Sequence, residues 1–339
     1  MDRRNFLKRL SSGLVYSSFG AGFLNKGFVE KNPSLTIPPE IAKMGRGEVS
    51  LIRGESRREN LLEALELMKD VIKEQIGERT VVIKPNIVAT QNRIAVTHVE
   101  CLRAILDFLQ PITDKQVIIA ENPAREKAFD AFETLGYLDE LKNYNVKFMD
   151  LATDEYEKFY VLDSEFHPLS VQVAKTVLRP DIYLISAHLL KTHDYVVITH
   201  SLKNIVMGVI QKNAEVNDKR KMHQGYKAMN YNLFRIGRYI RPHLAVTDGF
   251  IGMEGRGPIR GGSVDSRVAM VSPDFMAADR MAAELMGLNF EDIGYLTYCA
   301  NADMGEADLR KIKIRGNSIQ ECKKAFEPPP SFDRMLQWR

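Results

Sequence analysis

Short runs of β-branched and other apolar residues alternate, in the first half of the chain, with stretches whose apolar positions recur at helical spacing. Strands and helices are therefore expected to follow one another in a regular order, with Thr97 placed to cap the second helix. This order predicts an α/β fold with a mostly parallel, doubly wound sheet covered by helices. The expected strands are 48–53, 79–84, 116–120 and 146–150, and the expected helices are 57–76, 98–109 and 124–141.

The second half of the chain departs from this order. Two alternating stretches, separated by a loop that contains Pro168, predict an inserted antiparallel β-hairpin. The long stretch from 191 to 241 has helical spacing and few strand signals. Ser272, followed by Pro273, is placed to cap a helix that ends near Gly287. The strands expected here are 158–163, 170–175, 181–186 and 243–247.

Length and composition limit what this pattern can build. Of the 339 residues, 45% are apolar and 27% are charged, which excludes disordered, collagen-like and coiled-coil proteins. The sequence has no run of about 18 apolar residues, the length that a membrane-spanning helix needs. We therefore expect one large α/β domain. The predicted parts are an export signal (1–27), a linker (28–47), the α/β domain (48–316) and a C-terminal tail (317–339).

The first residues resemble a twin-arginine (Tat) export signal. Arg3 and Arg4 are followed by a weakly hydrophobic stretch at 13–24 that is too short to span a bilayer. We expect the Tat translocase to recognise this signal and the protein to be periplasmic, with the signal either cleaved after about residue 27 or kept as an anchor. Because this route carries folded proteins, the signal also favours a cofactor inserted before export, for example a divalent metal.

The formal charge of +3 belongs to this signal. It holds five basic residues and one acid, and without them the totals of 47 basic and 44 acidic residues become 42 and 43. A nucleic-acid partner is therefore not expected. Cys101, Cys299 and Cys322 form no Cys-x-x-Cys pair, which excludes a disulfide framework, a zinc ribbon and a ferredoxin-type iron–sulfur motif.

Polar residues gather where the predicted strands end. In open α/β sheets, ligands bind beyond the carboxyl ends of the strands. Lys84 and Asn86 follow one strand and are expected to bind an anion, unless they are merely a solvated strand end. Lys191 and His193 follow another strand, and on an extended chain they share a face suited to an anion or to proton transfer. His188 and His200 lie close to them in sequence.

Residues 249–262 include six glycines, which let the backbone approach a ligand or present its N–H groups to an anion. The spacing fits neither a Walker loop nor a dinucleotide fingerprint, and a flexible hairpin loop is the simpler alternative. Charged residues in this segment favour a binding role. The candidates are Gly255, Gly257, Arg256 and Arg260 for an anion, and Asp248 and Glu254 for a hard cation.

One basic stretch remains outside the signal. Residues 203–241 contain nine lysines and arginines and two acids. Such a patch attracts a small anionic molecule, for example a carboxylate or a phosphate, although a solvated helical face has the same composition.

Several of these motifs together resemble the DUF362 family of proteins of unknown function. The resemblance covers about residues 49–316 and rests on the order and spacing of the motifs. Some members carry ferredoxin-type clusters, whose cysteines this chain lacks. The motifs are Val82-Ile83-Lys84-Pro85-Asn86, Lys191-Thr192-His193, Ser201 to Gly208, Asp248-Gly249, Met253 to Pro258, and Asp274 with Asp279.

A weaker resemblance is to nickel-pincer lactate racemases. It rests on Leu135-Gly136 and on His200, Lys203 and Gly208, although the spacing differs and the racemases' glycine pair before the lysine is absent. This resemblance implies that His200 and Lys203 contact a cofactor.

The sequence thus predicts an exported enzyme, of oxidoreductase or isomerase type, that binds a small anionic substrate or an inserted cofactor. His193, Lys191 and Lys203 are the predicted catalytic residues, and Asn204 joins the anion-binding set. The alternatives are a non-catalytic periplasmic ligand-binding protein, which would return its ligand unchanged, and an assembly factor.

Overall fold

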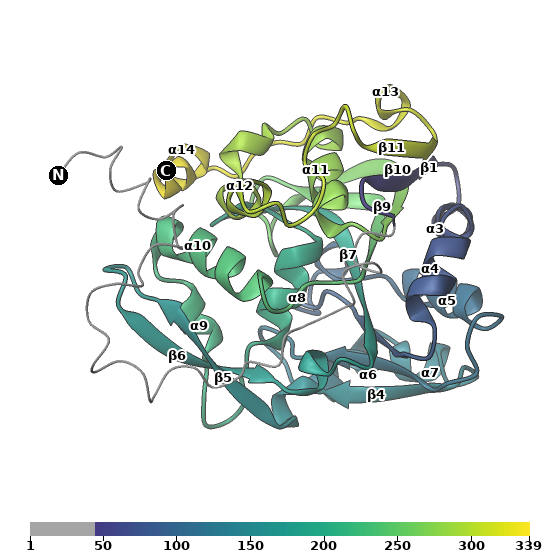
Figure 1. Ribbon diagram of the computed structural model, residues 1–339, viewed down its shortest axis with the longest axis horizontal. Helices are drawn as coiled ribbons and strands as arrows, with labels where there is room; N and C mark the ends of the chain where they lie inside the picture. Colours follow the sequence, from purple (N-terminus) through teal and green to yellow (C-terminus); the bar gives the residue numbers. More distant parts are fainter. Residues whose placement is uncertain (1–44) are drawn as a thin grey trace, which may run out of the picture. The chain divides into compact units, whose positions relative to one another are not determined.

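The computed structural model describes residues 45–339, so the predicted export signal and most of the linker lie outside the described residues. Nine strands of the described part form one sheet in the order β11-β1-β10-β9-β7-β2-β3-β4, with β8 paired to β7 (Figure 1). The strands are β1 (Glu48–Arg53), β2 (Thr80–Lys84), β3 (Val117–Glu121), β4 (Val146–Asp150), β7 (Ile182–His193), β8 (Val197–Thr199), β9 (Leu244–Glu254), β10 (Gly262–Ser272) and β11 (Lys313–Gly316).

The sheet is mostly parallel, as predicted. Strand pairs β4–β3, β3–β2, β2–β7, β7–β9 and β1–β11 are parallel. Strand β10 runs antiparallel to both of its neighbours, and β8 folds back on β7. The predicted hairpin is a separate two-stranded sheet of β5 (Tyr156–Leu162) and β6 (Pro168–Ala174).

Helices cover both faces of the sheet, because alternate strand residues enter two different cores. On one face, Val81 and Ile83 pack with the helices of the first half, whereas Val82 faces the helices of the second half. This arrangement confirms the doubly wound fold. The first set is α3 (Arg57–Glu66), α4 (Lys69–Ile76), α5 (Val99–Leu109), α6 (Ala128–Thr134) and α7 (Tyr137–Glu140). The second set includes α8 (Ser201–Val209), α9 (Lys219–Met222), α10 (Gly225–Gly237), α11 (Phe275–Leu285) and α12 (Gly294–Asn301).

Two predicted helices are each divided in the structure. The helix expected at 57–76 breaks at Leu67 and Met68, and the apolar pattern conceals the break because α3 and α4 both bury side chains in the same core. The helix expected at 124–141 breaks at Gly136, whose φ of 77° is left-handed and ends the helical geometry. Strands β1 and β2 follow each other along the chain but are not neighbours in the sheet, because β10, β9 and β7 lie between them.

Two helix caps also differ from the prediction. His98, not Thr97, caps α5, because the Thr97 hydroxyl instead donates to the carbonyl oxygen of Ala187 and accepts the N–H of Asn86. Asp274, not Ser272, caps α11. Asp274 directly precedes the helix, and its carboxylate accepts the backbone N–H groups of Met276 and Ala277 in the first turn.

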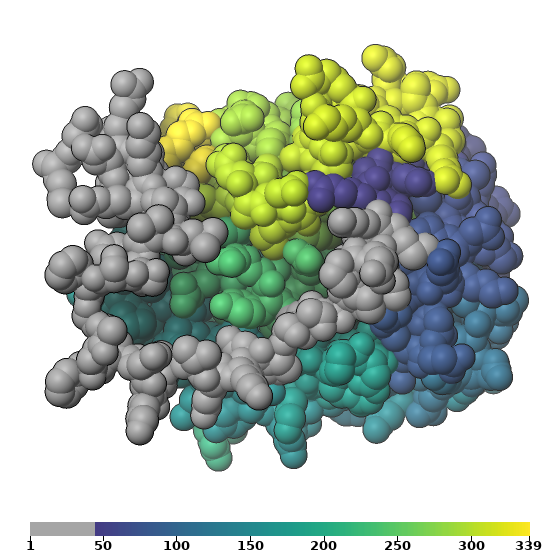
Figure 2. Space-filling view, in the orientation of Figure 1, coloured from purple at the N-terminus to yellow at the C-terminus, as the bar shows by residue number. Residues whose placement is uncertain are grey.

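The C-terminal residues pack against the domain. Strand β11 lies beside β1, where residues from the two ends of the described chain meet (Figures 1 and 2). Beyond α13 (Ile319–Cys322), the short helix α14 (Phe332–Met335) buries Met335, and the Trp338 indole donates to the carbonyl oxygen of Asp292. None of the helices in residues 45–339 has the length and apolar character needed to cross a bilayer.

Candidate functional site

A group of buried lysines lies where β2, β3 and β7 meet α8 and α9. Lys84 ends β2 and Lys191 lies in β7, while Lys203 and Lys219 belong to α8 and α9. We call these four residues the lysine cluster, and all of them are buried. The sequence predicted that Lys191 and His193 follow a strand, but β7 continues through them to residue 193. All twelve residues of β7 are buried, so periodicity could not mark its end.

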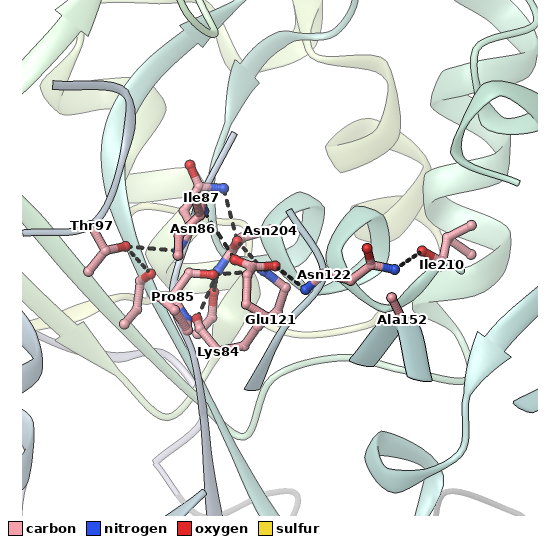
Figure 3. A network of polar contacts seen from close by, with 12 residues as sticks. Lys84, Pro85, Asn86, Ile87, Thr97, Glu121, Asn122, Ala152, Asn204 and Ile210 are labelled. Atoms are coloured by element: carbon pink, nitrogen blue, oxygen red, sulfur yellow. Dashed lines mark hydrogen bonds and ion pairs between the residues drawn. The ribbon is translucent and has the colours of Figure 1, made fainter. Parts of the chain in front are cut away.

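Lys84 is paired with Glu121, which ends the neighbouring strand β3. Its Nζ lies 2.8 Å from Glu121 and also donates to the carbonyl oxygen of Pro85 and to Asn204 Oδ1 (Figure 3). Glu121 additionally accepts the N–H groups of Asn122 and Ile87. A buried ion pair is stable only when its remaining hydrogen-bonding groups are satisfied, and these are. The pair therefore holds the neighbouring strands in place and leaves Lys84 no donor for a ligand.

Two asparagines extend this network to Lys191. Asn86 Nδ2 donates to Asn204 Oδ1 over 2.9 Å, and Asn86 Oδ1 accepts Lys191 Nζ over 2.7 Å. Lys191 also donates to the carbonyl oxygen of Ala95, so two of its three N–H groups are used. Asn204 Nδ2 donates to Ser186 Oγ. The sequence-predicted residues Lys84, Asn86, Lys191 and Asn204 are thus joined by direct hydrogen bonds.

The remaining two lysines have few partners. Lys219 donates to the carbonyl oxygen of Asn122. Lys203 is 5% exposed, and in residues 45–339 its Nζ makes no hydrogen bond. Burial lowers the pKa of each of these two lysines to about 7. An ammonium group has three donors, so Lys203 and Lys219 keep the most hydrogen-bonding capacity for a ligand.

His193 lies beside this centre as a neutral imidazole. Burial, followed by the nearby charges of Lys203, His223 and Lys191, lowers its pKa well below the usual value. Its Nδ1 accepts the backbone N–H of Tyr195 over 3.0 Å, which places the proton of the neutral ring on Nε2. His193 therefore presents a hydrogen-bond donor rather than a base.

The charges of the site are strongly unbalanced. Glu121 pairs with Lys84 and acts on Lys191 and Lys219, whereas the negative charge that acts on Lys203 is that of the exposed Asp194. The positive charge of Lys203 contributes to lowering the pKa of Lys191 and of Lys219, after the larger effect of burial. A bound anion would supply the missing negative charge.

The glycine-rich segment is a hairpin turn that reaches this region. Residues 249–254 belong to β9, and 255–261 connect β9 to β10. A Cβ on Gly257 would lie 2.0 Å from the carbonyl oxygen of Thr192, so glycine is required for the turn to pack on β7 beside His193. Gly255 has a left-handed φ of 66°. Arg256 and Arg260, predicted to bind the anion, are exposed and lie outside the buried network.

The predicted cation ligands Asp248 and Glu254 are not brought together. They lie six residues apart on β9, about 20 Å along an extended strand. Asp248 pairs with Arg57 over 3.1 Å, and Glu254 accepts the backbone N–H of Glu327. Burial raises the pKa of Asp248.

A different group has the spacing of metal ligands. Donor atoms of His188, His200 and Asp279 lie within 4.8 Å of one another, the sole such group of three found in residues 45–339. Asp279 accepts His200 Nδ1 and the N–H groups of Ser201 and Leu202, and thereby caps α8 from the neighbouring helix α11. Because its oxygens are already used, we assign Asp279 a structural role. His200 pairs with Asp279, whereas Lys203 faces the lysine cluster.

Two residues of the site carried no assigned role in the sequence analysis. Glu121 was recognisable as a carboxylate at the end of a parallel strand, the same signal that identified Lys84. Lys219 gave no such signal, because it lies in a four-residue helix within a generally basic stretch.

Comparisons with known proteins give one family and a few distant relatives. Residues 81–284 match the model of the family described as "Domain of unknown function (DUF362)". A thylakoid-associated protein of Synechocystis sp. is 26% identical over 254 residues, which cover 71% of this chain and 75% of that protein.

Two solved structures are similar over part of their length. The lactate racemase apoprotein of Thermoanaerobacterium thermosaccharolyticum aligns with a TM-score of 0.43 at 14% identity, over 70% of this chain and 57% of that one. A protein of Thermotoga maritima aligns with a TM-score of 0.36 at 14% identity, over 60% of this chain and 52% of that one. The chain therefore spans little more than half of either structure.

Proposed function

The chain belongs to the DUF362 family, and we propose that it is an enzyme whose lysine cluster binds a small anionic substrate that reacts with the amine of Lys203. The observation that carries this proposal is the state of Lys203: it is buried, it has no hydrogen-bond acceptor in the described part of the chain, and its pKa is about 7. Burying a lysine without a hydrogen-bond acceptor destabilises the folded protein. Lysines with strongly shifted pKa values are concentrated at functional sites.

The other members of the site would have distinct tasks. Lys191 and Lys219, which retain unused N–H groups, would hold the negative group of the substrate. Lys84, Glu121, Asn86 and Asn204 would position them, because their own hydrogen bonds are directed at one another. His193 would donate a hydrogen bond from Nε2 to an oxygen of the substrate.

The test is turnover of small carboxylates and phosphates by the purified protein. We would incubate it with a panel of 2-hydroxy acids, 2-oxo acids and sugar phosphates and follow each compound by proton NMR, including exchange of its hydrogens in heavy water. Lys203→Arg keeps the charge and should lose at least about 100-fold in rate. Arg256→Gln, at an exposed arginine outside the network, should keep the wild-type rate.

The outcomes separate an enzyme from a binding protein. A compound that binds but always returns unchanged would favour the ligand-binding alternative and overturn the catalytic part of the proposal. Equal rates for Lys203→Arg and the wild type would remove Lys203 from the reaction.

We also propose that the protein is exported by the twin-arginine route. The N-terminal Arg3 and Arg4 support this, and so does the relative that is described as thylakoid-associated. In cell fractions, the full chain should be extracytoplasmic, and replacing both arginines by lysine should retain it in the cytoplasm. Unchanged localisation of that variant would contradict the route.

A further inference from the structure

We propose that Lys203 forms a covalent imine with an aldehyde or ketone that carries a carboxylate or phosphate group. This inference rests on the proposed function and adds the chemical class of its substrate. An amine attacks a carbonyl carbon only through a free lone pair, so the reacting lysine must be uncharged in part of the molecules and must not be committed to acceptors.

Of the four lysines of the cluster, Lys203 is the one that makes no hydrogen bond within residues 45–339; Lys219, whose pKa is also about 7, donates to the carbonyl oxygen of Asn122. Lys84 donates to Glu121, Pro85 and Asn204 and has no free N–H group. Lys191 is held by Asn86 and Ala95. Lys203 makes no hydrogen bond within residues 45–339, so its Nζ can turn toward a bound carbonyl group without breaking one.

The surroundings of Lys203 favour its uncharged form. It is 5% exposed, which penalises the ammonium ion. The charge of Lys203 contributes to lowering the pKa of Lys191 and Lys219, whereas the carboxylate of Asp194 acts on Lys203 and favours its ammonium form, an effect smaller than that of burial. A desolvated lysine beside other cationic groups is a recognised way to make an amine nucleophilic at neutral pH.

The same cations select the substrate. A carbonyl compound with a negative group would place that group against the unused donors of Lys191 and Lys219 and its carbonyl carbon near Lys203. The neutral His193 would donate from Nε2 to the carbonyl oxygen as negative charge develops there. An uncharged aldehyde lacks the first of these contacts, so it should react more slowly.

The reaction needs no oxidant or reductant. The Nζ lone pair forms a bond to the carbonyl carbon, and the C=O π electrons move to the oxygen. That oxygen takes up a proton, nitrogen loses one, and the resulting carbinolamine expels water as the nitrogen lone pair forms the C=N bond. The products are the imine, which protonates to the iminium ion, and one molecule of water.

The test traps this imine on the wild-type protein. Glyoxylate serves as the anionic aldehyde, and sodium cyanoborohydride supplies hydride that converts the imine into a stable carboxymethyl-lysine. Peptide mass spectrometry then gives the rate of labelling at every lysine in one sample. At pH 7 we expect Lys203 to be labelled at least about tenfold faster than the exposed Lys127 with glyoxylate, and propionaldehyde to show a smaller preference because it lacks the anion contact.

Glycolate, which has the same carboxylate but a hydroxyl group in place of the aldehyde, separates the two proposals. Three results together support both the anion site and the imine. Glycolate raises the melting temperature of the wild-type protein, Lys203 is labelled preferentially, and glycolate slows that labelling. Binding of glycolate without preferential labelling of Lys203 overturns the imine and leaves the anion site intact. If neither glycolate nor glyoxylate binds, and Lys203 is not labelled, both proposals fail.

Two variants serve as matched controls. Lys203→Arg removes the nucleophile and keeps a cation, so labelling at the site should disappear. Lys158→Arg makes the same kind of change at an exposed lysine of β5, outside the lysine cluster, and labelling of Lys203 should persist. Fast labelling of Lys219 in the wild type, with Lys203 untouched, would contradict the assignment.

Discussion

A lysine ammonium that is buried without an acceptor loses its hydration and gains nothing in return. Lys84 avoids this loss through Glu121 and two neutral acceptors, whereas Lys203 avoids it by releasing its proton near neutral pH. The two residues illustrate how environment divides chemically identical side chains into a fixed positioning group and a reactive one. At the scale of single residues, the site depends on this difference.

Replacing Lys203 by Met should stabilise the protein in a pH-dependent way. The pKa of Lys203 falls from 10.5 in the unfolded chain to about 7 in the fold, so its destabilising effect is complete below pH 7 and disappears as pH rises toward 10.5. Thermal unfolding should give Lys203→Met a melting temperature higher by about 2–5 °C at pH 6, with the gap closing by pH 10.

Lys127→Met, at an exposed lysine, is the control and should show no comparable pH dependence. A gap between Lys203→Met and the wild type that stays constant from pH 6 to pH 10 would contradict the lowered pKa.

At the scale of elements, α8 organises the site. Its first turn is fixed by Asp279 of α11, and its Asn204 accepts a hydrogen bond from Lys84 of β2 and donates one to Ser186 of β7. One turn later, Gly208 leaves the space through which the Lys84 side chain reaches Glu121. The helix therefore needs an acceptor at its start and a glycine in its last turn.

Asp279→Asn should weaken the fold. The substitution removes the charge that caps α8 and pairs with His200, and it leaves buried donors without full partners. In denaturant unfolding we expect a loss of about 2–4 kcal/mol. Asp181→Asn, which removes an exposed ion pair with Arg179, should cost less than about 0.5 kcal/mol. Equal stability of the two variants would show that Asp279 does not fix α8.

Gly208→Ala should damage both stability and anion binding. The added Cβ would lie 1.5 Å from Lys84 Cε, and Lys84 cannot move without leaving Glu121. We expect unfolding to be easier by about 1–3 kcal/mol. Gly237→Ala is the matched change in another helix: its added Cβ would lie 3.1 Å from the end of the flexible Leu202 side chain. Its free energy of unfolding should stay within about 1 kcal/mol of the wild-type value. Normal glycolate binding by Gly208→Ala would contradict the role given to Lys84.

At the scale of the whole molecule, the strand order assembles the site. Strands β3, β2 and β7 are adjacent and parallel, and their register sets Lys84 opposite Ser186 and brings Glu121 to the same edge. Residues separated by more than 100 positions, such as Lys84 and Asn204, therefore share a hydrogen bond. Ligands of open α/β sheets bind at such edges.

The sequence predicted this edge more reliably than its details. The rule that polar residues follow apolar strands places Lys84 and Asn86 at the end of β2, and it led to Lys191 although that residue lies inside β7; a hydrogen bond joins Asn86 to Lys191. A strand that is buried along its whole length, such as β7, shows no alternation of apolar and polar residues, so the sequence does not indicate where it ends. The sequence also does not show how a turn folds. The exposure of Arg256 and the burial of Lys219 beside the site therefore became known only from the structure. Capping by Asp279 was equally hidden, since it lies 78 residues from Ser201.

The protonation of Lys203 can be measured directly. Protein labelled with 13C at lysine Cε would be titrated by NMR, with the Lys203 signal assigned from Lys203→Arg. We expect a midpoint near pH 7 that moves upward when glycolate binds, because a bound anion favours the ammonium ion. A midpoint near 10.5 that glycolate leaves unchanged would contradict it.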